Sequence, residues 1–432
     1  MNATPNESRP RLTPVAISER VELIDILRGF ALLGILTVNF WGSSGETARR
    51  LDRIVTDVLD IAVSSSFYPL FSFLFGLGFA VQLLRARERG AGVVTTYVRR
   101  LLALFLIGAF HAIVIWNGDI LVTYAILGLV LVPLHRLSDR WLVAIAAVVL
   151  TAGSLGPAAQ GLLNRVGGEQ AAETRVLSDL ARFERNRTGW VLTERADLDS
   201  NTTRLRSFTT SIATRWSQFR MGVRWELSRH SLLSDIAAIF LLGFVVGRRR
   251  ILQEAARHRN ALTAAAAIGL TASIAGTLVV YVWKPASAVL NSLGWSFQDY
   301  GATMFYISAI SVGVTFVPAV ARAFRHFAPA GRIGLTNYLL ESITMTVLFS
   351  RYGASLKQPS TALWLGINLV FFFGLLLPFS RWWIQRFRFG PAEWVWRSLT
   401  YGEPQPMRLG VATDSTSPLA APSSVPAVDR VG

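Results

Sequence analysis

Runs of about twenty apolar residues recur along this chain, and they constrain its fold more than any other feature. A helix needs roughly 20 apolar residues to cross a hydrocarbon core of ~30 Å. Only 16% of the residues are charged, against about a quarter in soluble proteins. The pattern therefore predicts an all-α, polytopic transmembrane helical bundle of about ten spans. The predicted spans lie near residues 23–41, 64–84, 99–116, 119–135, 141–163, 231–247, 260–283, 300–320, 333–350 and 361–383.

Arginines between the apolar runs give the predicted bundle an orientation. Short cytoplasmic loops of membrane proteins are enriched in Lys and Arg. Here the arginines cluster in every second connection, and all of these connections face the cytoplasm if the first run starts there. The short connections on the other side, 117–118, 284–299 and 351–360, carry few basic residues. We therefore predict a multi-pass protein of the bacterial cytoplasmic (inner) membrane with both ends inside.

The formal net charge of +16 would favour a nucleic-acid partner in a soluble protein. In this chain the basic residues instead form short clusters between apolar runs, where they set topology. The expected partner is the lipid bilayer, and no nucleic acid.

The remaining segments suggest one transmembrane domain with appendages. Residues 1–402 form the domain, and residues 164–230 are expected to form an extracytoplasmic, amphipathic loop insertion. Residues 390–402 combine tryptophans with charges, which suits a helix in the headgroup layer. Residues 403–432 are rich in Pro, Ser and Ala and are predicted to be a disordered cytoplasmic tail.

Ionisable side chains inside predicted spans are costly and suggest a function. In the first span Asp25 and Arg28 are three residues apart, so they share a helix face and can pair. Asn39 follows Arg28 by close to three full turns and lies on that same face. The three residues either line a site or form an orienting pair and a packing contact.

The third span holds His111, eight residues before Asp119 across a tight hairpin. A neutral imidazole near a carboxylate can act as a general base that the acid orients. The other interpretation is a structural hydrogen bond to a neighbouring helix. The hairpin also brings Asn117 to the outer surface, with Tyr124 further along the next span.

The ninth span places Thr336, Asn337 and Glu341 on one broad face, and Arg332 immediately precedes it. A carboxyl at the depth of Glu341 pairs with a cation such as Arg28, or is held protonated. Polar contacts between helices are the alternative. In the second span, Gly76 and Gly78 are expected to allow close helix packing.

Several classes of chemistry lack their motifs. The chain has no cysteine, so thiolate catalysis and cysteine metal sites are excluded. It has no Gly-rich phosphate loop, HExxH pair or Gly-x-Ser-x-Gly elbow. No metal or organic cofactor is implied.

Five pieces of the sequence resemble one family in their order along the chain. They are IDILRGFALLGILTVNF, FYPLFSFLFGLGFA, FHAIVIWNGDILVTYAILG, GRIGLTNYLLESI and GPAEWVWRSLTYG. This order is typical of the YeiB-like family of bacterial membrane proteins, defined by a domain of unknown function (domain 418). The family in turn is distantly similar to membrane acyltransferases of the heparan-glucosaminide acetyltransferase type, chiefly in the first span.

That resemblance implies acyl transfer from a cytoplasmic donor such as acyl-CoA, although the chain departs from the pattern. Asn39 stands where many bacterial O-acyltransferases have a histidine, and asparagine cannot act as a general base. Glu341 replaces an expected glutamine, and Val122 stands where some relatives have histidine. His111 is then the only intramembrane imidazole available, with Arg28 meeting the donor. The alternatives are a transporter for a small solute or lipid headgroup and a structural or signalling membrane protein.

Overall fold

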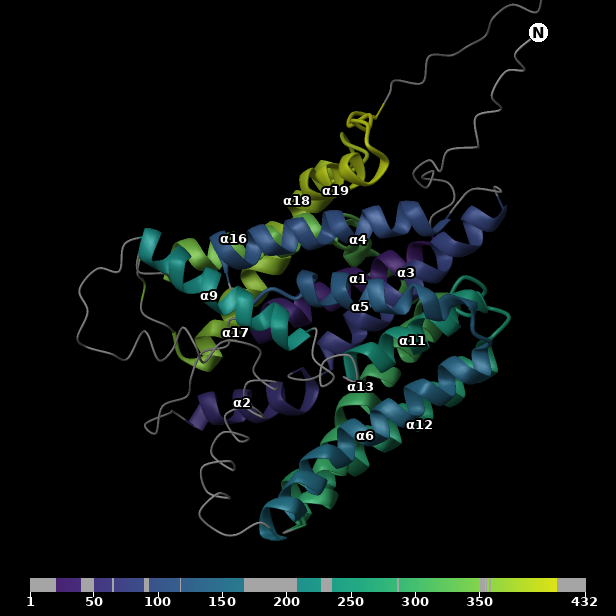
Figure 1. The fold of residues 1–432 in the computed structure, drawn as a ribbon, viewed down its shortest axis with the longest axis vertical. Helices are drawn as coiled ribbons and strands as arrows, with labels where there is room; N and C mark the ends of the chain where they lie inside the picture. Colours follow the sequence, from purple (N-terminus) through teal and green to yellow (C-terminus); the bar gives the residue numbers. More distant parts are fainter. Residues whose placement is uncertain are drawn as a thin grey trace, which may run out of the picture.

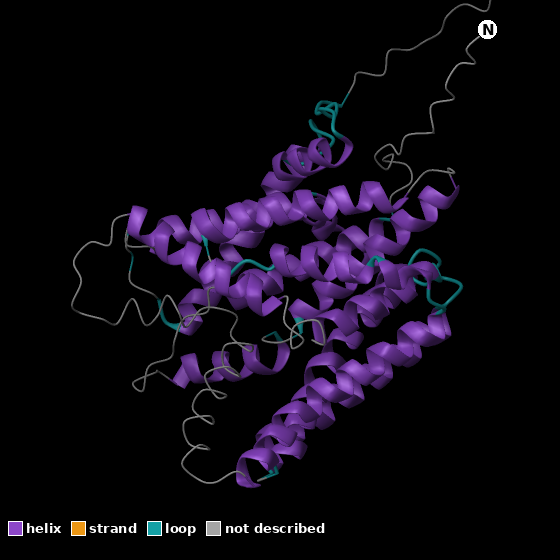
Figure 2. Cartoon of the chain, viewed as in Figure 1, coloured by secondary structure: helices purple, strands orange, loops and turns teal. Residues whose placement is uncertain are grey.

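The computed structural model describes residues 21–39, 50–63, 66–88, 93–116, 118–166, 208–226, 235–285, 287–349, 354, 356 and 359–409. Within these ranges the chain is helical and contains no strand; one isolated bridge joins Phe387 and Arg408 (Figure 2). The predicted all-helical fold is confirmed.

Each of the ten apolar runs lies on a helix (Figure 1). Three of the helices continue into π-helical turns, η2 (His111–Ile115), η4 (Leu278–Trp283) and η6 (Phe372–Leu376). The helices of the runs are α1 (Glu22–Asn39), α3 (Phe67–Glu88), α4 (Val93–Phe110), α5 (Leu121–Leu131), α6 (Asp139–Val166), α11 (Asp235–Arg248), α12 (Arg259–Thr277), α13 (Ala288–Phe316), α16 (Gly334–Phe349) and α17 (Thr361–Phe371) with α18 (Leu377–Ile384).

Four helical segments are long and apolar enough to cross a membrane by length and composition. A bent pair, Val289–Phe316 with Pro318–Arg332, would be a fifth. By contrast α5, α11 and α16 have 11, 14 and 16 residues, fewer than the roughly 20 of a full crossing. The number of spans and their orientation therefore stay predictions. The four segments are Arg50–Arg85, Val94–Ile115, Arg259–Trp283 and Thr361–Ile384.

Proline explains the sharp turn after α13. The chain direction bends by 117° between the two helices of this pair. Val317, between them, is extended (φ −118°, ψ 104°) because the ring of Pro318 disfavours a helical residue before it. The chain then continues through the short helices α14 (Pro318–Phe324), η5 (Arg325–Phe327) and α15 (Ala328–Arg332), which lead into α16.

Helix α2 (Arg50–Ala62) lies where no span is predicted. Its exposed face carries Leu51, Ile54 and Val58, spaced as on one side of a helix. On its other side, buried Asp52 accepts a hydrogen bond from Ala362 N at 3.0 Å, which caps the start of α17. An amphipathic helix of this kind suits a membrane interface.

The described part of the predicted loop insertion includes helix α9 (Phe208–Glu226). Arg215, which is buried, donates to Val114 O at 3.0 Å, and Phe219 contacts Phe105. The helix therefore packs against α4 and η2. Residues 167–207 and 227–230 of the insertion lie outside the described residues. Of the predicted tail, residues 403–409 are described, and Gln405 O accepts from Trp394 Nε1 at 2.7 Å.

Two helix crossings depend on glycine. A Cβ on Gly29 would lie 2.0 Å from Phe327 O, and one on Gly331 would lie 1.9 Å from Asp25 O. The backbone of α1 therefore touches the end of η5 and α15 directly, as small residues allow in membranes. A Cβ on Gly76 would likewise lie 2.0 Å from Phe240 O, so the predicted packing role of Gly76, here between α3 and α11, is confirmed.

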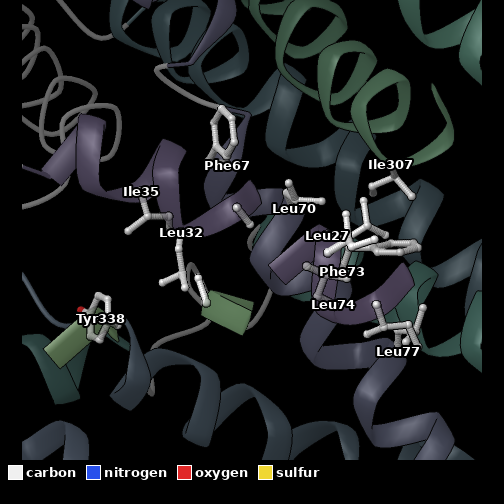
Figure 3. Close-up of a cluster of buried hydrophobic side chains, with 14 of the residues drawn as sticks. Leu27, Leu32, Ile35, Phe67, Leu70, Phe73, Leu74, Leu77, Ile307 and Tyr338 are labelled. Atoms are coloured by element: carbon white, nitrogen blue, oxygen red, sulfur yellow. The ribbon is translucent and has the colours of Figure 1, made fainter. Parts of the chain in front are cut away.

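The core lies between α1 and α3. Leu27 and Leu32 of α1 and Leu70 and Leu74 of α3 are almost completely buried there (Figure 3). Large apolar side chains on the outer faces remain exposed instead, among them Leu106, Ile268, Val282, Val347 and Val370. An apolar exterior around an apolar core is what a lipid environment favours.

Replacing Gly29 by alanine tests the α1–α15 crossing. The added methyl overlaps Phe327 O, so we expect a loss of roughly 1–3 kcal/mol in the free energy of unfolding. Gly366→Ala in α17 is the matched control, because a Cβ there meets nothing within 4 Å. Thermal unfolding in detergent should show a lower Tm for Gly29→Ala alone, and equal Tm values would contradict the crossing.

Candidate functional site

His111 and Asp119 form a buried pair across the hairpin after α4. The His111 Nδ1 atom lies 2.8 Å from Asp119 Oδ1, and both side chains are at most 2% exposed. Asp119 Oδ2 accepts from Val122 N at 2.8 Å, at the first turn of α5. Since a carboxylate only accepts, it fixes the proton on Nδ1 and leaves the lone pair on Nε2. Sequence reasoning predicted this pair, and the structure brings it together.

A π-helical turn, η2, begins at His111. Such turns insert an extra residue into a helix and are frequent at functional sites. The turn ends at Trp116, whose N–H donates to His111 O at 2.8 Å and whose ring lies 6.3 Å from the imidazole. The π turn that contains His111 therefore leads directly into the hairpin. Asn117, the next residue, lies outside the described residues.

Tyr338 of α16 packs against the imidazole. The two ring centroids are 5.1 Å apart. His111 Nε2 is buried and has no hydrogen-bond partner among the described residues, whereas the Tyr338 hydroxyl lies beside the backbone of Ile120. Buried polar atoms are nearly always hydrogen-bonded, so the unpaired His111 Nε2 indicates a place for a polar ligand or water.

A chain of tyrosines connects this pair to α1. Tyr68 donates to Asn39 Oδ1 at 2.5 Å, and Tyr124 donates to Tyr68 O at 3.2 Å. Asp119, Tyr68 and Tyr124 all lie close enough to interact electrostatically with the Tyr338 hydroxyl. His111, Asp119 and Tyr124, which sequence reasoning selected, therefore lie near Tyr338, and Asn39, also selected, contacts Tyr68. Tyr68 and Tyr338 were missed, and their only signal was a polar tip within an apolar run.

The first two turns of α1 hold a second group of charges. Arg28 Nη1 lies 3.3 Å from Asp25 Oδ1, as the three-residue spacing predicted. The Arg28 side chain is 37% exposed, whereas that of Asp25 is 11% exposed. Asn39 is eleven residues further along α1, roughly 16 Å away. The two ends of the predicted stripe thus belong to different groups.

Glu393 of α19 (Pro391–Tyr401) caps the start of α16. Its Oε1 accepts from Leu335 N at 2.6 Å and Thr336 N at 3.2 Å, and its Oε2 accepts from Thr336 Oγ1 at 2.5 Å. Burial raises the pKa of Glu393, while the hydrogen bonds from Thr336 and Leu335 oppose that rise. A carboxylate at a helix N-terminus satisfies otherwise unpaired N–H groups. Sequence reasoning placed Glu393 in an interfacial helix but missed this contact.

Asn337 and Glu341 face another part of the bundle. Asn337 Nδ2 donates to Ala330 O at 3.1 Å and to Ser380 Oγ at 2.9 Å, which ties α16 to α15 and α18. Glu341 is buried, and neither of its oxygens has a partner among the described residues. A pairing with Arg28 is not observed, because Arg28 contacts Asp25. Arg332 also has a buried Nε without a hydrogen-bond partner in the described ranges.

A metal centre finds no support in the part of the chain that is described, where no three His, Asp or Glu side chains come together to hold an ion. The chemistry that the geometry offers is proton transfer. His111 Nε2 carries a lone pair that can accept a proton, and the imidazole is oriented by a carboxylate and shielded from water. Tyr338 adds a hydroxyl that can donate to an oxygen of a bound molecule.

Known proteins of similar sequence give a family rather than an activity. Residues 246–403 match a family model described as "Protein of unknown function (DUF418)". The chain is 30% identical to uncharacterized protein YxaH of Bacillus subtilis, over 92% of this chain and 98% of that one. It is 28% identical to uncharacterized protein YeiB of Escherichia coli, over 88% and 96% of the two chains.

Glu393→Ala tests the carboxylate cap of α16. Leaving the N–H groups of Leu335 and Thr336 buried and unpaired is expected to cost roughly 1–3 kcal/mol in the free energy of unfolding. Glu88→Ala is the control, since Glu88 is exposed and its ion pair with Arg250 contributes about 0–1 kcal/mol. Thermal unfolding in detergent measures both, and a Tm for Glu393→Ala no lower than that of Glu88→Ala would contradict the cap.

Proposed function

The chain belongs to the DUF418 family, and from this premise we propose that it is a multi-pass protein of the bacterial inner membrane that transfers an acyl group. The observation that carries the proposal is the buried His111–Asp119 pair, whose Nε2 has no partner among the described residues and whose imidazole packs on Tyr338. The proposed donor is a cytoplasmic acyl thioester such as acyl-CoA.

The proposed topology has ten spans with both ends in the cytoplasm. Its support is that each apolar run lies on a helix and that arginines cluster in alternate connections. The π turns lengthen two of the helices to 22 and 25 residues, Val94–Ile115 and Arg259–Trp283.

Because the chain has no cysteine, single cysteines can report this topology. We expect Glu254→Cys to be protected from a membrane-impermeant maleimide in intact cells, and Lys284→Cys to react. The two positions lie at opposite ends of α12 and are at least partly exposed. Equal labelling of both in intact cells, with equal labelling after lysis, would reject the ten-span arrangement.

Proton transfer at His111 would proceed as follows. His111 Nε2 takes the proton of an acceptor hydroxyl or amine as the acceptor attacks the thioester carbonyl. The carbon–sulfur bond breaks, and the imidazolium returns its proton to the departing thiolate. Asp119 stabilises the imidazolium through Nδ1, and Tyr338 can donate to the oxyanion of the tetrahedral intermediate. A bond to the acceptor replaces the bond to sulfur, so atoms and protons balance.

Helix α16 connects the two polar groups. It contains Thr336, which contacts Glu393 of α19, and two residues later Tyr338, which contacts His111. The two residues are about 3 Å apart along the helix axis. A donor held near α19 could therefore present its acyl arm along one turn of α16 rather than through the whole bundle.

Loss of the imidazole tests the proposal. His111→Ala should reduce acyl transfer from acyl-CoA in membranes by roughly 10²–10⁴-fold, and Asp119→Asn by a smaller factor. His258→Ala is the control, because His258 lies outside the spans, before α12. Unchanged transfer by His111→Ala, with normal amounts of folded protein, would remove His111 from the mechanism.

A transporter is the second candidate, and one observation favours it. Glu341, Asn337 and Asn368 each have a buried oxygen without a hydrogen-bond partner in the described part of the chain. Polar groups at this depth suit a permeation path. Solute uptake by proteoliposomes without any acyl donor, abolished by Glu341→Gln but not by His111→Ala, would favour transport over acyl transfer.

A further inference from the structure

Three arginines from three helices meet at the end of the bundle that is proposed to face the cytoplasm. Arg28 of α1, Arg100 of α4 and Arg397 of α19 are close enough for each charge to act on the other two. Burial and Arg28 lower the pKa of Arg397, against the opposing effect of Tyr401 and Glu393. Like charges gathered in this way are unfavourable unless an anion joins them.

Aromatic rings rather than carboxylates hold two of these guanidinium groups. The guanidinium carbon of Arg100 lies 3.7 Å from the centre of the Trp396 ring, and Trp396 Nε1 donates to Arg100 O at 2.8 Å. Arg397 lies over Phe389 at 4.6 Å. Stacking occupies the flat face of a guanidinium and leaves its N–H edge available for oxygen ligands.

The nearby carboxylates offset only part of this positive charge. Asp25 contacts Arg28, and both oxygens of Glu393 accept hydrogen bonds from the start of α16, although Glu393 and Asp25 also act electrostatically on Arg397. Within the described ranges no ion pair joins a carboxylate to Arg100 or Arg397. The N–H edges of these two half-buried arginines therefore have no carboxylate partner in those ranges.

Space for a ligand lies beside Arg28. A Cβ built on Gly78 of α3 would meet only Arg28 Nη2, at 3.4 Å, and no other atom within 4 Å. This differs from Gly76, two residues earlier, where a Cβ would meet the backbone of α11. Gly78 was expected to serve packing, but a Cβ there would meet only the partly exposed guanidinium of Arg28.

We propose that Arg28, Arg100 and Arg397 bind the phosphate groups of an anionic ligand beside Gly78. Guanidinium forks match phosphate oxygens in pairs, and a ligand with two or more phosphate charges balances the excess positive charge. This inference rests on the proposed function, under which the ligand that carries the phosphate groups is an acyl donor of the coenzyme A type. The same chemistry would also accept an anionic phospholipid headgroup.

Binding can be measured on the full chain in detergent, without acyl transfer. Isothermal titration with coenzyme A and with inorganic pyrophosphate should show saturable binding that weakens as salt rises. Arg100→Gln and Arg397→Gln should each raise the Kd about tenfold or more. Arg386→Gln is the matched control, because Arg386 also stacks on a tryptophan, Trp382 at 4.7 Å, but lies outside the cluster, and its Kd should not change.

A second pair of variants avoids removing a charge. Gly78→Leu should block the space beside Arg28 and abolish binding, whereas Gly78→Ala fits at 3.4 Å and should bind normally. Equal binding by Gly78→Leu and wild type would place the ligand elsewhere and overturn the proposal.

Lipid vesicles distinguish a phospholipid headgroup from coenzyme A as the ligand that supplies the phosphate. Protein in phosphatidylcholine vesicles is compared with protein in vesicles that also contain phosphatidylglycerol. Stabilisation by phosphatidylglycerol that requires Arg100 and Arg397, without coenzyme A binding, would support the site with lipid as its ligand. No arginine-dependent effect of pyrophosphate, coenzyme A or phosphatidylglycerol would refute it.

His111→Ala distinguishes this inference from the proposed function. The variant should bind coenzyme A like the wild type even though it transfers no acyl group. Normal transfer by His111→Ala together with arginine-dependent binding would defeat only the proposed role of His111. Loss of transfer without any anion binding would defeat only the arginine site.

Discussion

The direct contact between the backbones of α1 and α15 fixes the position of everything around it. Gly29 and Gly331 lie against backbone atoms of the opposing helix, so neither helix can move away or rotate without losing the contact. Because α15 leads straight into α16, the crossing also places Thr336 and Tyr338. Helix packing in lipid has little hydrophobic driving force, so such close contacts, together with buried hydrogen bonds, define the arrangement.

Two polar groups depend on this arrangement, and α16 connects them. At one end Glu393 and three arginines gather around α19 and the start of α1. At the other, His111 and Asp119 meet Tyr338, Tyr68 and Asn39. The bundle thus has two distinct polar regions, which α16 joins through Thr336 and Tyr338.

The sequence was informative wherever a feature depends on neighbours along the chain. Apolar runs located ten helices, the three-residue spacing located the Asp25–Arg28 pair, and the tight hairpin brought His111 to Asp119. Helix α2 was missed because its apolar residues form a stripe rather than a run, which hydropathy cannot detect.

Contacts between distant segments could not be predicted in the same way. Nothing in the single sequence indicates that Tyr338 packs on His111, that Glu393 caps α16 or that Trp396 stacks on Arg100. Glu341 shows the same limit, since one of the two states expected for its carboxyl, a pairing with Arg28, is not observed among the described residues. Such contacts follow from which helices meet, and that is set by close backbone packing.

The π turn at His111 makes the histidine–aspartate pair sensitive to the number of residues between its two members. A π turn holds one residue more than an α turn, and each residue rotates a helix by about 100°. Deleting one residue from 112–115 would let α4 run on as an ordinary helix, but the hairpin would leave it in a different direction. Asp119 would then point away from His111 although neither residue had changed. The His111–Asp119 hydrogen bond therefore requires this segment to keep its length. Relatives that have both residues but a longer or shorter segment would not form the pair.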